Sequence, residues 1–120
     1  MLKILCPTDF SNNSRYACEY AIDLANKLNA QLTFLTTYDS VVVDSIKSIE
    51  EKIREATEED LHYFVNKLKP LIKSGIEPQL IVKDGDASDQ ILYYAASSKQ
   101  SFVIMGTKGS SSLLSMLMGS

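Results

Sequence analysis

The sequence predicts a single α/β domain built on a doubly wound parallel sheet. Short apolar runs that fit buried strands alternate with longer amphipathic stretches that fit helices, in the order βαβαβαβ. A chain of 120 residues has room for one domain, so residues 1–120 are assigned to one unit. Hydrophobic residues at 45% and charged residues at 22% exclude a disordered tail, a fibrous repeat and a disulfide scaffold.

The first half of the chain contains two strands and the first helix. Residues 2–6 are a short apolar run closed by a proline, as expected of a buried strand. Ser11 or Asn12 can cap the following helix, and Asn29 ends it. Residues 31–38 are rich in β-branched and aromatic types and predict the second strand. Three- and four-residue spacing predicts that the helix faces the sheet with Tyr16, Ala17, Tyr20, Ala21, Leu24, Ala25 and Leu28.

The second half adds two helices and two strands. A long helix is predicted over 44–69, where a following proline ends it. The third strand is predicted over 77–82, with a start left open by Pro78, the third helix over 88–98 and the fourth strand over 101–105. The two helices are expected to face inward with Ile46, Ile49, Ile53, Ala56, Leu61, Phe64, Val65 and Leu68, and with Ile91, Leu92, Ala95 and Ala96.

Charge and cysteine content narrow the classes of function. Twelve basic and fifteen acidic residues give a net charge of −3, which argues against a broad nucleic-acid surface. Cys6 and Cys18 form neither a secreted disulfide framework nor a CxxC pair, and both are predicted to be ordinary buried thiols. The N-terminal apolar run is too short for a signal peptide, and no stretch is long enough to span a membrane. We therefore expect a cytoplasmic protein that binds neither nucleic acid nor membrane.

The end of the chain carries the most distinctive pattern. Gly106 and Gly109 are followed, after nine residues, by Gly119 and Ser120, a spacing of G-x2-G-x9-G-S with Lys108 between the first two glycines. Glycines let a backbone approach a ligand closely, and successive N–H groups can then cradle phosphate oxygens. The spacing is neither a Walker A loop nor GxGxxG, and a flexible Gly/Ser loop is the alternative interpretation.

Other polar residues give weaker signals. Pro7-Thr8-Asp9 follows the first strand, at the edge of a parallel sheet where ligands usually bind. Asp9 fits either a ligand contact or a turn that caps the next helix, and Lys108 fits either a phosphate contact or a solvated loop. His62 is the single histidine and is expected to be structural, because no second ligand at zinc spacing accompanies it. No nucleophile–base pair is evident, so the sequence identifies no catalytic residue.

These segments together resemble the universal stress protein family, in its ATP-binding type. The resemblance spans all 120 residues and rests on the glycine spacing, which is complete to its last residue, and on four matching segments: KILCPTDFS at 3–11, the helix at 17–28, GDA at 85–87 and VIMGTKG at 103–109. It implies a Rossmann-like fold, similar to adenine nucleotide alpha hydrolases, with five parallel strands. Family domains continue through a further helix and strand, so the chain is expected to lack these two elements after Ser120.

The resemblance also implies a ligand and the residues that hold it. The ligand would be ATP, with Mg²⁺ or Mn²⁺, lying across the ends of the first and fourth strands. The adenosine side would be lined by Pro7, Thr8, Asp9 and Met105, and by Thr37 in place of the family's usual apolar residue. The phosphates would be held by Gly106, Lys108, Gly109, Gly119 and Ser120.

The implied function is an ATP-binding regulatory module of the stress response. It would signal by nucleotide-dependent conformation or partner binding, as a homodimer, with slow ATP hydrolysis at most. The alternative is a dimerisation or interaction module whose glycine loop is vestigial or incomplete. A nucleotide-dependent transferase or ligase is a third and weaker hypothesis, because the sequence offers no acceptor site.

Overall fold

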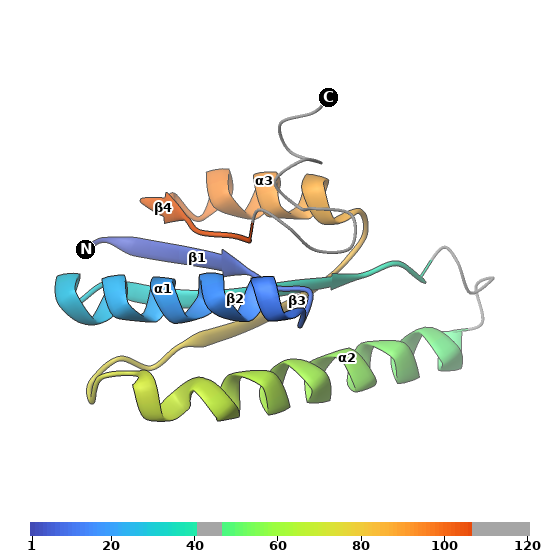
Figure 1. Cartoon of the computed structure of the whole chain (residues 1–120). Helices are drawn as coiled ribbons and strands as arrows, with labels where there is room; N and C mark the ends of the chain where they lie inside the picture. The colour runs from blue at the N-terminus through green and yellow to red at the C-terminus, as the bar shows by residue number, and fades with distance from the viewer. Residues whose placement is uncertain (41–46, 107–120) are drawn as a thin grey trace.

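A computed structural model describes residues 1–40 and 47–106. They form a four-stranded parallel sheet in the order β3-β2-β1-β4, and the predicted fold class is confirmed (Figure 1). In chain order the elements are β1 (Lys3–Pro7), α1 (Asn12–Leu28), β2 (Gln31–Tyr38), α2 (Lys47–Leu68), the short 3₁₀ helix η2 (Lys69–Leu71), β3 (Gln79–Asp84), α3 (Ala87–Ser97) and β4 (Phe102–Val103). None of the helices in this described part is long and apolar enough to cross a membrane.

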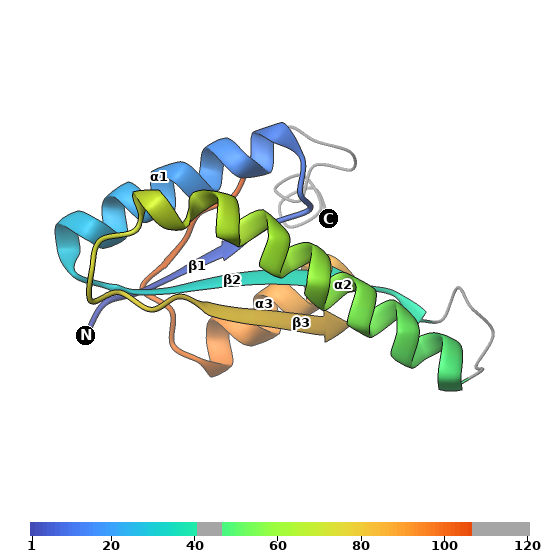
Figure 2. The same cartoon turned by 90° about the horizontal axis from the view of Figure 1, so that it is seen from below.

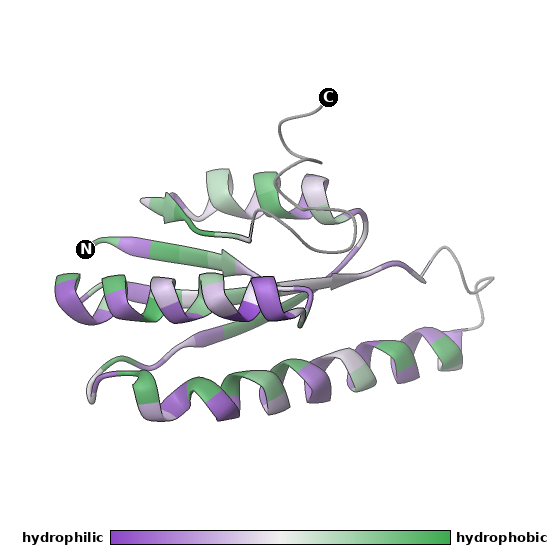
Figure 3. Ribbon diagram, in the orientation of Figure 1, coloured by the Kyte–Doolittle hydropathy of each residue, from purple (hydrophilic) through white to green (hydrophobic). Residues whose placement is uncertain are grey.

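The sheet is covered on both faces. Helices α1 and α2 lie side by side on one face and α3 lies on the other (Figure 2). Side chains alternate along β1, so Ile4 and Cys6 enter the cluster under α1 and α2, whereas Leu5 enters the smaller cluster under α3. Because β1 meets helices on both faces, it is hydrophobic along most of its length, while polar and apolar residues alternate along α1 and α2 (Figure 3).

The ends of α1 follow the sequence prediction. Ser11 is the N-cap, and its hydroxyl accepts a hydrogen bond from the backbone N–H of Ser14 at 3.1 Å. Asn29 ends the helix in the left-handed conformation, with φ of 52° and ψ of 46°, which asparagine tolerates well. These caps set the boundaries between β1, α1 and β2.

The predicted inward faces need correction. Tyr16 and Tyr20 of α1 are 59% and 64% exposed, and Leu28 is also exposed. The prediction is confirmed for Ala21 and Ala25, which are buried, and for Leu24, which packs against the core. It is wrong for the two tyrosines, which fit the apolar spacing but lie on the exposed side of α1. The residues of α1 that are buried are Ser14, Cys18, Ala21, Ile22 and Ala25.

The other two helices differ from the prediction in the same way. The buried residues of α2, Leu61, Val65 and Leu68, lie in its second half, whereas its first half extends past the end of β3 and leaves Ile49 and Ala56 exposed (Figure 2). Ile46 lies outside the described residues. In α3, Ile91 is buried and Ala95 packs against the core, both as predicted. Leu92 and Ala96 are exposed, and Tyr94, which was not predicted, packs against the core.

Strand boundaries move by one or two residues. β1 includes Pro7, and β3 begins at Gln79, directly after Pro78, which has no N–H to donate to the ladder. The fourth strand is shorter than the predicted 101–105 and covers Phe102–Val103 alone. After it the chain stays beside β1 through Ile104, whose N–H donates to the carbonyl of Leu5, and reaches the first turn of α1 at Gly106.

Candidate functional site

Two chain segments leave the sheet side by side at its carboxyl edge. β1 and β4 are parallel neighbours, with Leu5 paired to Val103, and the N–H of Ile104 donates to the carbonyl of Leu5 at 2.9 Å. Continuing this register by two residues brings Met105 level with Pro7. Open α/β sheets bind ligands at such an edge, and of the predicted site residues the structure brings Pro7 and Met105 together there.

The turn after β1 is held by its own side chains. Thr8 is buried, and its Oγ1 accepts hydrogen bonds from the N–H of Phe10 at 3.0 Å and from the hydroxyl of Ser14. Asp9 Oδ1 accepts the N–H of Ser11, also at 3.0 Å. Phe10 adopts a left-handed conformation, with φ of 67°. The Thr8 hydroxyl therefore fixes the turn. The bond from the Ser11 N–H to Asp9 Oδ1 agrees with the interpretation of Asp9 as a turn residue.

Three predicted site residues share one face of the sheet. By the alternation of side chains, Pro7 and Thr37 point to the α3 face, as Leu5 and Leu35 do. Met105 packs against the same cluster as Leu5 and Leu35. Pro7 is paired with Leu35 in the ladder, and the half-buried Thr37 lies two residues further along β2. Pro7 is fully buried, whereas Thr37 and Met105 are partly exposed, so only these two present surface at the carboxyl edge.

Gly106 lies against the first turn of α1. A Cβ atom at this position would be 3.1 Å from the carbonyl oxygen of Asn13 and 3.2 Å from its carbonyl carbon, so even a methyl group would force the backbone to shift. The glycine is thus explained by a close backbone approach. It places the start of the glycine-rich segment at the N-terminus of α1, where helix N–H groups and the helix dipole favour an anion.

The remaining predicted phosphate ligands, Lys108, Gly109, Gly119 and Ser120, lie outside the described residues. Their role stays a prediction from the sequence. Among the residues that the structure describes, no group of three or more His, Cys, Asp and Glu side chains is arranged to hold a metal ion.

Sequence reasoning missed one polar contact at the same edge. Ser40, just beyond β2, donates both its N–H and its hydroxyl to the two carboxylate oxygens of Asp84 at the end of β3, at 3.0 and 2.6 Å. These two hydrogen bonds hold the pKa of Asp84 below its usual value. The two residues are 44 positions apart, so no local spacing could have shown the pair. Asp86 is the N-cap of α3, and its side chain accepts a hydrogen bond from the backbone N–H of Asp89.

The strand order and the helices on both faces define a doubly wound α/β domain in which β1 and β4 end side by side. The family model described as the universal stress protein family matches residues 1–120. The chain belongs to the universal stress protein family, which confirms the resemblance seen in its sequence motifs.

Individual relatives agree with this assignment. Universal stress protein YxiE of Bacillus subtilis is 27% identical over 128 residues, covering 98% of this chain and 86% of that protein. Universal stress protein MJ0531 of Methanocaldococcus jannaschii is 27% identical, covering 98% of this chain and 71% of that protein. Among solved structures, hypothetical protein MJ0577 superposes with a TM-score of 0.73 at 26% identity, covering 90% of this chain and 76% of its own. A universal stress protein solved in complex with cAMP gives 0.68 at 23% identity, covering 99% and 83%.

Proposed function

We propose that the chain is an ATP-binding regulatory module that acts in the stress response by nucleotide-dependent conformation or partner binding. Adenosine would lie against Thr37 and Met105, above the buried Pro7 and beside the Thr8–Asp9 turn. The phosphates would lie along Gly106, Lys108, Gly109, Gly119 and Ser120. We assign no catalytic residue.

The free thiols Cys6 and Cys18 fit a reducing compartment such as the cytoplasm.

The observation that carries this proposal is the contact of Gly106 with the first turn of α1. Gly106, the first glycine of the segment, lies against the first turn of α1 and directly follows Met105. An adenine nucleotide has one flat apolar end and one anionic end, and this edge offers a surface for each. The relative solved with cAMP supports the same ligand class, because cAMP also joins adenosine to a phosphate. Mg²⁺ or Mn²⁺ would neutralise the ATP phosphates, with Asp9 as the nearest carboxylate of the site.

Calorimetric titration with ATP and Mg²⁺ tests the proposal, with cAMP titrated in parallel. We expect one nucleotide per chain and tighter binding of ATP than of cAMP, because Lys108 and the glycines have more phosphate groups to contact. Gly109→Val should abolish binding by blocking the backbone approach. Lys108→Ala should weaken ATP binding by about tenfold, the equivalent of one charge-assisted hydrogen bond.

The matched control is Lys73→Ala, which removes an exposed lysine from the loop between η2 and β3. This loop lies at the amino ends of the strands, away from the proposed site. Its affinity should equal that of the wild type. Equal affinity of wild type and Gly109→Val would contradict the phosphate assignment. A wild-type chain that gives no heat with any nucleotide, and no rise in melting temperature, would favour the interaction-module alternative.

We also propose that the chain pairs with a second copy along β4. This strand is at the edge of the described sheet, and Phe102 and Val103 are 43% and 41% exposed there. An exposed apolar edge strand is a template for pairing with another strand. Sedimentation should show a dimer at micromolar concentration, and Val103→Lys should return it to a monomer. Lys52→Ala, on the exposed part of α2, should leave the dimer intact. A monomer for the wild type at all concentrations would contradict the pairing.

A further inference from the structure

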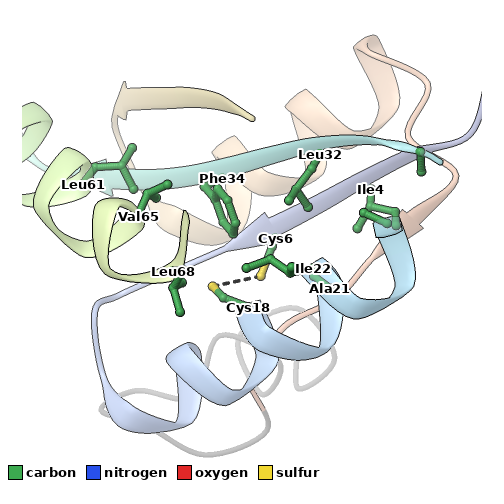
Figure 4. Close-up of a cluster of buried hydrophobic side chains, with 12 residues drawn as sticks. Ile4, Cys6, Cys18, Ala21, Ile22, Leu32, Phe34, Leu61, Val65 and Leu68 are labelled. Atoms are coloured by element: carbon green, nitrogen blue, oxygen red, sulfur yellow. Dashed lines mark hydrogen bonds between the residues drawn. The ribbon is translucent and has the colours of Figure 1, made fainter. Parts of the chain in front are cut away.

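Two free cysteines meet in the larger hydrophobic cluster. Cys6 comes from β1 and Cys18 from α1, and neither has any exposed surface. Their sulfur atoms are 3.2 Å apart, with the Cys6 thiol donating to Cys18 (Figure 4). Buried cysteines usually pack as small hydrophobic residues among carbon atoms. Here each sulfur has the other as its direct neighbour, so the pair can undergo chemistry that neither cysteine could undergo alone.

We propose that Cys6 and Cys18 form a dithiol site that a peroxide converts into a reversible intramolecular disulfide linking β1 to α1. One thiolate attacks hydrogen peroxide, the O–O bond breaks, and a sulfenic acid and one water are formed. The second thiol then attacks the sulfenic sulfur, the S–O bond breaks, and the S–S bond forms with release of a second water. Two thiols lose two electrons and two protons, and one peroxide is reduced to two waters. A dithiol reductant reverses the reaction by thiol–disulfide exchange.

The geometry suits this bond. A disulfide needs its sulfurs about 2.05 Å apart, so the observed 3.2 Å must close by about 1.2 Å. Rotation of the two cysteine side chains can supply much of this change. Cys18 is followed one turn later by Ala21 and Ile22, which pack in the same cluster, and the small Ala21 side chain leaves α1 close to β1. With α1 packed on β1, as in the structure, the sulfenic intermediate would have the second sulfur beside it.

Burial makes the site slow rather than inert. The hydrogen bond with Cys18, together with burial, raises the pKa of Cys6 well above its usual value, so this thiol stays protonated at neutral pH. Oxidation therefore proceeds when the N-terminal part of α1 opens locally and admits peroxide. Opening of this part would also disturb the hydrogen bond between Ser14 and Thr8, at the turn after β1. The disulfide would prevent this local opening, because it would tie α1 to β1, the strand that ends in this turn.

The test uses the wild-type chain treated with hydrogen peroxide under native conditions, then denatured, alkylated and analysed by mass spectrometry. We expect a product lighter by two hydrogen atoms in which neither cysteine is alkylated and which dithiothreitol restores. Trypsin cleaves after Arg15, between the two cysteines, so the product should contain peptides 4–15 and 16–27 joined together. Cys6 and Cys18 should lose their reactivity toward the alkylating agent at the same rate, because each disulfide consumes one of each.

Single variants and thermal melting complete the test. Cys6→Ala and Cys18→Ala should each give no joined peptide, and the remaining cysteine should stay alkylatable or carry oxygen adducts. The oxidised wild type should melt about 5 °C above the reduced form, because the bond restricts the unfolded chain. The proposal is overturned if both wild-type cysteines stay alkylatable, if they gain oxygen independently without a joined peptide, or if the joined form arises only between two chains. A lower melting temperature of the oxidised form would also overturn it, since the bond would then not fit the native core.

Discussion

Replacing Phe34 with alanine is expected to lower the free energy of unfolding by about 3–5 kcal/mol. Phe34 has no exposed surface and lies in the middle of β2, which is paired with β1 on one side and β3 on the other. Its side chain belongs to the larger cluster, to which both α1 and α2 contribute (Figure 4). The substitution removes a ring where strands and helices meet, and close packing prevents the surroundings from filling the space fully.

Urea denaturation measures this effect. Because domains of this kind are stable by about 5–15 kcal/mol, the Phe34 variant should unfold at a much lower urea concentration. The matched control is Tyr93→Ala, which removes an aromatic ring that is 69% exposed on α3. We expect the control to change the free energy of unfolding by less than about 0.5 kcal/mol. Equal losses in the two variants would show that the cluster around Phe34 is not the main core.

The sequence predicted those features that depend on neighbouring residues. The Ser11 cap, the Asn29 stop and the strand at 31–38 each follow from local preference, and the structure confirms them. Family and fold class were predicted for a related reason. Each distinctive segment, from the turn after β1 to Gly106, is contiguous and could be recognised without knowing what it packs against.

Features that depend on the rotation of a helix were predicted less well. Tyr16 and Leu92 have suitable apolar spacing, yet both are exposed, because the sheet and not the helix decides which side is buried. For Cys6 and Cys18 the sequence predicted burial correctly, but their 3.2 Å approach depends on how α1 is rotated over β1. The Ser40–Asp84 pair joins the ends of two strands and has no local pattern at all.

Gly106 has a packing role in addition to the phosphate contact that the glycine spacing predicts. The glycine spacing predicted a phosphate contact at this position, and that prediction stands as part of the proposed function. The structure adds that a Cβ atom at Gly106 would lie only 3.1 Å from the carbonyl oxygen of Asn13, so the backbone there would have to give way slightly. A close approach between residues so far apart in the sequence requires the fold to be known. The same glycine is thus needed for packing before any ligand binds.

Gly106→Val should therefore affect stability and nucleotide binding together. The new side chain would push the first turn of α1 away from the end of β4, and overpacking of this kind costs about 1–3 kcal/mol. The same displacement would separate the helix N–H groups from the start of the glycine-rich segment, so ATP affinity should fall at least about tenfold, the equivalent of one lost phosphate contact. Gly106→Ala should lower stability and ATP affinity by smaller amounts. Its methyl group would make the same close contacts with Asn13 as the Cβ atom of valine, but it lacks the two further methyl groups.

Stability and affinity are separated by a control with a similar loss of stability far from the site. Val65→Ala removes two methyl groups from the buried part of α2 and should also cost about 1–3 kcal/mol. Urea denaturation should give similar midpoints for Gly106→Val and Val65→Ala, while calorimetry under native conditions should show wild-type ATP affinity for Val65→Ala alone. If Gly106→Val unfolds at the wild-type midpoint, the close approach to Asn13 is wrong. If its midpoint falls but its affinity does not, Gly106 serves packing only, and the phosphate contact must be assigned to the later glycines.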